Sequence, residues 1–267
     1  MLGTIYGDKA GSIYEFNETK KIEGINPDKL ITENSFFSDD TIEMIAVADA
    51  IINNKDYEET LLGYIDEYKD YKPNYKPYFT HPFSPNTMKI LKGKGKKNSN
   101  GNGAMMRIAP VGYLFDKEED VIENARKITE IDHNCKESVD SATIIALMIF
   151  YFRKGLTKEE VYKKLSLKHD YKPFKKFNMT CSETLENCLY VIYNSESFED
   201  SIRKSLLMGG DTDTNCAITG SVAESLYGMT ESEKSDAIAN LPKGFVKVLK
   251  KSYDEISRWL SWIYIKV

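Results

Sequence analysis

Apolar residues recur along most of this chain at the spacing of one face of a helix. The clearest set occupies positions i, i+3, i+4, i+7 and i+8, as a 3.6-residue turn requires: Met44, Val47, Ala48, Ile51 and Ile52. The same repeat returns in three later sets: Leu61, Tyr64, Ile65 and Tyr68; Val121, Ile122, Ala125 and Ile128; and Leu249, Tyr253, Ile256, Leu260 and Ile263. No stretch alternates apolar and polar residues as a half-buried strand does. The pattern predicts an all-α fold with one core.

Polar residues and prolines mark where these helices begin and end. Thr157 with Glu160, and Thr230 with Glu233, have the spacing of a capping box, in which each side chain accepts a hydrogen bond from the other residue's free N–H. Residues 69–86 contain four prolines among tyrosines. Because proline lacks an N–H and interrupts a helix, we expect a loop there.

Length and composition describe an ordinary globular protein of 267 residues, 41% hydrophobic, with a formal net charge of −5. This length allows one large domain or two small ones, and a single core favours one domain over residues 1–267. The longest apolar run extends from Ala142 to Phe152, well short of the ~18 residues of a membrane span. We therefore expect a buried core helix there and no membrane association.

The N-terminal residues and the cysteines indicate the cellular compartment in which we expect the protein. The N-terminal residues lack a basic region followed by an apolar segment and a small-residue cleavage site, so no secretory signal is indicated. No cysteine pair has CxxC spacing, which favours reduced, packed thiols: Cys135, Cys181, Cys188 and Cys216. We expect a cytoplasmic monomer.

Two short acidic clusters stand where predicted helices begin. The first runs from Ser38 to Thr41, and the second, some 170 residues later, runs from Gly209 to Thr214. Carboxylate and hydroxyl oxygens without nearby Cys or His suit Mg²⁺, Mn²⁺ or Ca²⁺ rather than zinc. The two clusters together indicate a divalent-metal site.

Helix capping is the alternative interpretation, because Asp, Ser and Thr are preferred N-caps and acidic groups favour a helix N-terminus. For Ser38, Asp39 and Asp40 taken alone, capping is the stronger interpretation. One carboxylate is enough to cap a helix, however, and the second cluster gathers three oxygen donors behind a flexible glycine pair. Metal binding is therefore favoured for the second cluster.

A glycine-rich segment lies between the two clusters. Four lysines between Lys92 and Lys97 precede Asn98 to Gly103, and residues 104–107 are able to start a helix. Small residues expose backbone N–H groups, and a helix N-terminus adds positive potential, so this segment is a candidate cradle for a pyrophosphate. The lysines are either solvated surface charge or a means of attracting substrate or nucleic acid, and we expect no nucleic-acid partner.

Four blocks of this sequence, taken together, resemble the ADP-ribosylglycohydrolase family and occur in the family's order. They are Gly7 to Ser12 with Glu15, Phe37 to Thr41, Gly101 to Arg107, and Gly210 to Thr214. Any one block is a weak signal, whereas four in order form a strong one. The resemblance implies a single-domain orthogonal multi-helix bundle that releases ADP-ribose from a modified protein side chain or another ADP-ribosyl conjugate.

The resemblance also implies roles for individual residues. Glu15 would orient or deprotonate the attacking water, and Asp40 would join it in catalysis. His133 would face the nucleotide, and the diphosphate would lie against Ser99, Gly101, Asn102 and Gly103. Two Mg²⁺ or Mn²⁺ ions would be held by Ser38, Asp39, Asp40, Asp211, Asp213 and Thr214.

The sequence departs from the family pattern at three positions. Ser38 replaces a frequent threonine and keeps the hydroxyl. Asp132 stands where the family often has threonine before the histidine. Phe83 stands where the nitrogen-fixation branch has a functional aspartate, so either Glu15 does the carboxylate work alone or the activity is altered.

Two other classes of function fit the same residues. Paired metals and an anion-binding loop would also suit a phosphohydrolase that acts on nucleotides. A non-catalytic protein that binds ADP-ribose or an ADP-ribosyltransferase would need the same ligands without turnover. The acceptor to which ADP-ribose is joined is left open.

Overall fold

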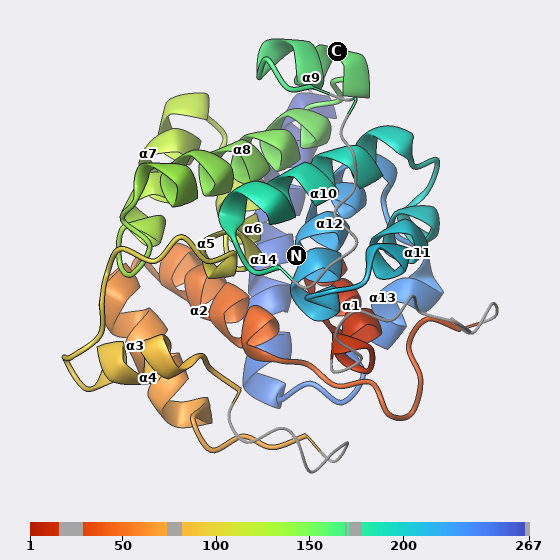
Figure 1. Cartoon of the computed structure of the whole chain (residues 1–267). Helices are drawn as coiled ribbons and strands as arrows, with labels where there is room; N and C mark the ends of the chain where they lie inside the picture. The colour runs from red at the N-terminus through yellow and green to blue at the C-terminus, as the bar shows by residue number, and fades with distance from the viewer. Residues whose placement is uncertain (16–28, 74–81, 169, 171–177, 265–267) are drawn as a thin grey trace.

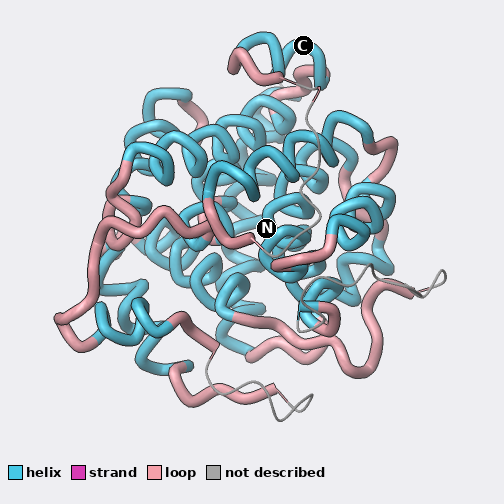
Figure 2. Tube along the Cα trace, viewed as in Figure 1, coloured by secondary structure: helices cyan, strands magenta, loops and turns pink. Residues whose placement is uncertain are grey.

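The structure is a computed structural model that describes residues 1–15, 29–73, 82–168, 170 and 178–264, the side chains of 258–264 excepted. The described chain is helical, and the β-type pairing within it is limited to two isolated bridges (Figures 1 and 2). The all-α prediction is confirmed. The helices are α1 Leu2–Ser12, α2 Asp39–Asn53, α3 Tyr57–Tyr68, α4 Pro85–Leu91, α5 Gly103–Met106, α6 Ala109–Leu114, α7 Glu118–Thr129, α8 Lys136–Arg153, α9 Lys158–Lys164, α10 Cys181–Asn194, α11 Phe198–Met208, α12 Thr212–Tyr227, α13 Glu231–Ile238 and α14 Lys243–Tyr264.

The predicted helix starts agree with the structure. Thr157 and Thr230 form capping boxes with Glu160 and Glu233, and each box begins a helix, α9 and α13 respectively. The apolar run from Ala142 to Phe152 lies in α8 and is largely buried, as expected of a core helix. Within the described residues, no helix combines the length and the apolar character needed to cross a membrane.

The prediction of a loop over residues 69–86 is wrong at its C-terminal end. Helix α4 already begins at Pro85, and the Ser84 side chain caps it by accepting from the Thr87 N–H. Proline is well suited to the first helical position, since its missing N–H would have no partner there. Residues 74–81 of this loop, and the side chains of Leu260 and Ile263, lie outside what the structure describes.

The helices α1 and α12 cross in backbone contact, and this crossing organises the middle of the molecule (Figure 1). Three glycines at i, i+4 and i+8 line the contact face of α1: Gly3, Gly7 and Gly11. A Cβ on Gly7 would lie 2.0 Å from the Cys216 carbonyl oxygen, and one on Gly11 would lie 2.2 Å from the Thr212 carbonyl oxygen. Only glycine allows the two backbones to approach this closely.

The buried Lys9 fixes the same helix against α13. Its Nζ donates to the carbonyl oxygens of Asp236, Ala237 and Ala239 at 3.1, 2.8 and 2.6 Å. These carbonyls end α13, where the helix dipole favours a cation. The result is that α1 is held between α12 and the C-terminus of α13.

We predict that Gly7→Ala destabilises the protein by about 1–3 kcal/mol, the usual cost of forcing a methyl group into a packed interface. Alanine favours helix by up to ~1 kcal/mol over glycine, so the loss must outweigh that gain. Urea unfolding measures the difference.

Gly63→Ala is the matched control. Gly63 lies inside α3 with nothing within 4 Å of its Cβ position. The methyl group meets no atom there, and we expect a gain of about 0.4–1 kcal/mol. Equal effects of the two substitutions would contradict the crossing as the source of the loss.

Candidate functional site

The residues singled out from the sequence gather around one cleft of about 440 Å³, a volume typical of small-molecule sites. The cleft lies where α1, α2 and α12 approach the loop before α5. Asp40 is buried and does not line it. The candidates that do line it are Glu15, Ser38, Asp39, Ser99, Gly101, Asn102, Gly103, His133, Asp211, Asp213 and Thr214.

The first acidic cluster forms the N-terminus of α2. Ser38 is the N-cap, and its Oγ accepts from the Asp40 N–H at 3.2 Å. The Asp40 Oδ2 atom accepts from the hydroxyls of Ser38 and Thr214, each at 3.2 Å. Because Thr214 belongs to α12, this oxygen joins the two clusters. The cap of α2 is thus a serine hydroxyl, so neither the Asp39 nor the Asp40 carboxylate is needed to cap the helix.

Asp8 also belongs to this cluster, and no role was predicted for it. Its Oδ2 accepts from the Ser38 N–H at 2.9 Å, from the Thr41 N–H at 3.2 Å and from the Thr41 hydroxyl at 2.5 Å. Its Oδ1 is buried without a hydrogen-bond partner, as is the Oδ1 of Asp40. Buried polar atoms are rarely left unpaired, so these two carboxylate oxygens are candidates to bind a cation or to carry a proton.

The second cluster forms the N-terminus of α12. Gly209 and Gly210 have φ of +70° and +76°, a left-handed conformation that favours glycine. Asp211 is the N-cap residue but makes no capping bond with its side chain. Instead, its Oδ2 accepts from the Asn102 amide at 2.6 Å. Capping therefore does not account for this carboxylate.

Glu15 faces this second cluster. One carboxylate oxygen from each of Glu15, Asp211 and Asp213 lies within 4.8 Å of the other two. Three carboxylates at this separation repel one another unless protons or a cation lie among them. The turn that follows α1 thus places the Glu15 carboxylate beside the two carboxylates at the start of α12.

Burial dominates the electrostatics of these groups. It raises the pKa of Asp39, Asp40 and Asp213 well above the usual value, and the neighbouring carboxylates raise it further. Burial, followed by the charges of Asp211 and Asp8, raises the pKa of Glu15 to about 8. Without a cation, part of this cluster holds protons near neutral pH.

The loop from Ser99 to Gly103 is fixed by its own hydrogen bonds. The Gly101 N–H donates to the Ser99 Oγ at 3.1 Å, and the Asn102 N–H donates to the Met179 carbonyl at 2.8 Å. The Gly101 and Asn102 N–H groups, which the sequence indicates as candidate donors to a diphosphate, therefore already donate to groups within the protein. A Cβ on Gly103 would lie 3.3 Å from the His133 Nε2, so glycine lets the imidazole lie against the loop.

A buried ion-pair network lies beside the cleft. The fully buried Arg107 donates to the Glu43 carboxylate at 2.8 Å and pairs with both oxygens of Asp132. The guanidinium and His133 hold the pKa of Asp132 below its usual range despite burial. Asp132 in turn accepts from the His133 Nδ1 at 2.6 Å, which leaves Nε2 beside the glycines of the loop.

This network was not predicted, although Arg107 ends one of the matched blocks. Its partners come from α2 and from the segment after α7, so no local spacing connects them. Phe83 is 4% exposed and lines the cleft, which makes this part of the wall apolar.

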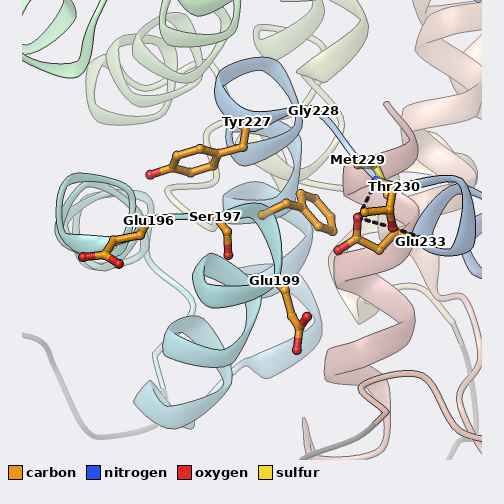
Figure 3. Close-up of a pocket in the computed structure, with 9 residues that line it drawn as sticks. Glu196, Ser197, Glu199, Tyr227, Gly228, Met229, Thr230 and Glu233 are labelled. Atoms are coloured by element: carbon orange, nitrogen blue, oxygen red, sulfur yellow. Dashed lines mark hydrogen bonds between the residues drawn. The ribbon is translucent and has the colours of Figure 1, made fainter.

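A second cavity, of about 490 Å³, lies at α11 and the turn between α12 and α13 and shares no lining residue with the cleft (Figure 3). Three of its polar groups are engaged within the chain: Glu233 accepts from Thr230, Glu199 pairs with Arg203, and the Tyr227 hydroxyl donates to the Ser195 carbonyl. It contributes no group to the acidic site.

Known proteins similar to this chain include ADP-ribosylhydrolases. ADP-ribosylhydrolase ARH3 of Mus musculus is 23% identical over 63% of this chain and 52% of its own length. ADP-ribosylarginine hydrolase Tri1 of Serratia proteamaculans is 24% identical over 53% of this chain and 43% of its own. The chain thus spans about half the length of these two relatives. It matches ARH3 of Homo sapiens at 21% identity over 88% of this chain and 86% of that one.

A solved structure has the same fold. It is described as an ADP-ribosylglycohydrolase-related protein complex and superposes with a TM-score of 0.70 over 96% of this chain and 93% of its own, at 18% identity. The sequence profile of the ADP-ribosylglycohydrolases matches residues 1–266. With the four sequence blocks brought together at one cleft, this match shows that the chain belongs to the ADP-ribosylglycohydrolase family.

Proposed function

We propose that this protein hydrolyses the glycosidic bond between ADP-ribose and an acceptor, with divalent cations held by the two acidic clusters. The observation that carries the proposal is the convergence of Glu15, Asp211 and Asp213 within 4.8 Å, beside the unpaired buried oxygens of Asp8 and Asp40. The relatives' names give the substrate class, since ARH3 and Tri1 are an ADP-ribosylhydrolase and an ADP-ribosylarginine hydrolase.

The residues at the cleft fit a hard divalent cation. The donors are carboxylate and hydroxyl oxygens, and burial, followed by the negative charge of the neighbouring carboxylates, raises the pKa of Asp39, Asp40 and Asp213. Cations bound here would supply positive charge that polarises substrate hydroxyl groups and water. Two Mg²⁺ or Mn²⁺ ions would be held by Ser38, Asp39, Asp40, Asp211, Asp213 and Thr214.

Hydrolysis requires water to attack the anomeric carbon as the bond to the acceptor breaks. Glu15 lines the cleft and is the group we assign to accept the proton of the attacking water. The departing acceptor takes up a proton, so the products are ADP-ribose and the unmodified acceptor. The positive charge that develops on the ribose in the transition state is stabilised by the surrounding carboxylates, Asp40 among them.

The remaining residues bind the rest of ADP-ribose. Ser99, Gly101, Asn102 and Gly103 line the cleft beside His133, and we place the diphosphate along this loop. The Asn102 side chain donates to Asp211, which couples the position of the loop to that of a metal ligand. With Nδ1 held by Asp132, His133 presents Nε2 to the same side as the loop glycines.

We predict that Asp211→Ala and Asp39→Ala each weaken Mg²⁺ or Mn²⁺ binding at least tenfold, because each removes a carboxylate ligand. Isothermal titration calorimetry measures the affinity. Asp66→Ala is the control, since Asp66 is an exposed carboxylate on α3 that pairs with Lys69. Unchanged cation affinity in both site variants would remove the basis of the metal assignment.

The raised carboxyl pKa values predict a pH dependence of stability with a defined sign. In the cation-free protein the folded state binds protons that the unfolded chain releases, so stability falls as pH rises. For Glu15 the window extends from the ordinary value of 4.5 to about 8. The melting temperature of the cation-free protein should fall from about pH 5 to pH 8, and saturating Mg²⁺ should reduce that fall. A melting temperature that rises over this window without cation would contradict the prediction.

We predict that Glu15→Gln releases ADP-ribose from a defined ADP-ribosyl conjugate at least about a hundredfold more slowly than the wild type, the usual range for general-base assistance being ~10²–10⁴. Affinity for ADP-ribose should stay near the wild-type value. Mass spectrometry of the products, over conjugates with different acceptors, measures the rate and identifies the linkage.

Glu33→Gln provides the matched control, because Glu33 is an exposed residue of the segment before α2. Its turnover should equal that of the wild type. Near-normal turnover of Glu15→Gln would refute its role. Release of inorganic phosphate from nucleotides, with no ADP-ribose formed from any conjugate, would favour a phosphohydrolase instead.

A further inference from the structure

The substrate-binding loop rests on two cysteines and a serine that do not line the cleft. Cys135 is the N-cap of α8, Ser138 lies in its first turn, and Cys181 begins α10. The Ser138 Oγ lies 3.1 Å from the Cys135 Sγ and 3.5 Å from the Cys181 Sγ. We call these three side chains the thiol–serine platform.

The platform binds the loop through its carbonyl oxygens. The Ser99 carbonyl accepts from the Cys135 thiol at 3.3 Å and from the Ser138 hydroxyl at 2.9 Å. The Gly101 carbonyl accepts from the Cys181 thiol at 2.9 Å. The carbonyl between them, that of Asn100, accepts from the Cys181 backbone N–H at 2.8 Å. Three successive carbonyls are thus bound by α8 and α10.

This arrangement bears on anion binding. A carbonyl oxygen is the negative end of a peptide dipole and repels a phosphate, so a loop that lies against a diphosphate must keep its carbonyls away from it. The platform residues are absent from the cleft lining, and the carbonyls they bind are therefore directed out of the cleft. The loop residues Ser99 and Gly101 still line it.

The buried thiol of the platform is able to donate a hydrogen bond to a loop carbonyl. Cys181 is fully buried, and burial raises the pKa of its thiol to about 12. It therefore stays protonated at neutral pH and can donate a hydrogen bond. Without the platform, the loop carbonyls would be left unpaired or would turn toward water in the cleft.

We propose that Cys135, Ser138 and Cys181 are positioning residues that hold the Ser99–Gly101 carbonyls out of the cleft and so set the affinity for the diphosphate of the substrate. This inference rests on the proposed function, because it takes ADP-ribose as the ligand. The cysteines thereby gain a role that their spacing in the sequence did not indicate.

The test compares Cys181→Val, which removes the donor at similar volume, with Cys181→Ser, which keeps a donor. Loss of one neutral hydrogen bond corresponds to roughly three- to tenfold in affinity. The Kd for ADP-ribose should rise by that factor in Cys181→Val and return to within about twofold of wild type in Cys181→Ser. The KM for a conjugate should rise with it while kcat stays near wild type, and Mg²⁺ affinity should change little.

Two further variants serve as a control and as an independent test of the platform. Cys188→Val alters another buried thiol two turns further along α10 and should leave ADP-ribose affinity unchanged. Ser138→Ala removes the shared hydroxyl without adding volume and should weaken ADP-ribose binding as Cys181→Val does, even if the valine variant fails to fold. Wild-type ADP-ribose affinity in Ser138→Ala, or no recovery in a folded Cys181→Ser, would overturn the inference and leave the proposed function standing. A wild-type protein that binds Mg²⁺ but not ADP-ribose would overturn the proposed function itself.

Discussion

The backbone contact between α1 and α12 is the constraint on which the site depends. Glycines on the contact face of α1 bring the two helices together, and the acidic residues stand at the ends that this crossing places side by side. Asp8 lies inside α1 and Glu15 just beyond it, while Asp211 and Asp213 begin α12. A wider crossing would separate these carboxylates and open the cleft to water. The glycines of the first sequence block therefore act through helix packing.

Bringing these carboxylates together is costly, because each loses its hydration and meets others of the same charge. The side-chain cations buried among the described residues make their hydrogen bonds elsewhere, although the charge of Lys9 also acts on Asp8. Lys9 donates to the carbonyls that end α13, and Arg107 is shared by Glu43 and Asp132. The negative charge around Asp40 and Asp211 thus has no buried counter-charge within the described chain, which is the physical reason for assigning divalent cations to this site.

The features that the sequence predicted correctly are those that depend on residues close together in the chain. Helical periodicity and the two capping boxes are properties of a few consecutive residues, and the predictions from them agree with the structure. The local composition of the two acidic clusters predicts a metal site, and the structure brings Asp211 and Asp213 together with Glu15. What was missed depends on contacts between distant segments. Asp8 sits in a helix that is buried on all sides, where no pattern distinguishes a ligand from a structural residue. The Arg107–Asp132 pair joins residues 25 positions apart. The Asn102 N–H donates to the carbonyl of Met179, a residue far along the chain, so this bond could not be predicted from the loop sequence.

Two of the three departures from the family pattern, Asp132 and Phe83, have different consequences. Asp132 adds a negative charge beside the loop proposed to bind the diphosphate, but its carboxylate pairs with Arg107 and accepts from His133, so the charge is balanced within the network. The hydrogen bond from His133 to the Asp132 carboxylate also fixes the orientation of the imidazole. A threonine hydroxyl at position 132 would be a weaker acceptor than a carboxylate. Phe83 has no such partner: it places a buried aromatic ring in the cleft wall where the nitrogen-fixation branch has a carboxylate. In the proposed mechanism the proton transfer therefore depends on Glu15 alone, and one of its carboxylate oxygens lies within 4.8 Å of an oxygen of Asp211 and of Asp213.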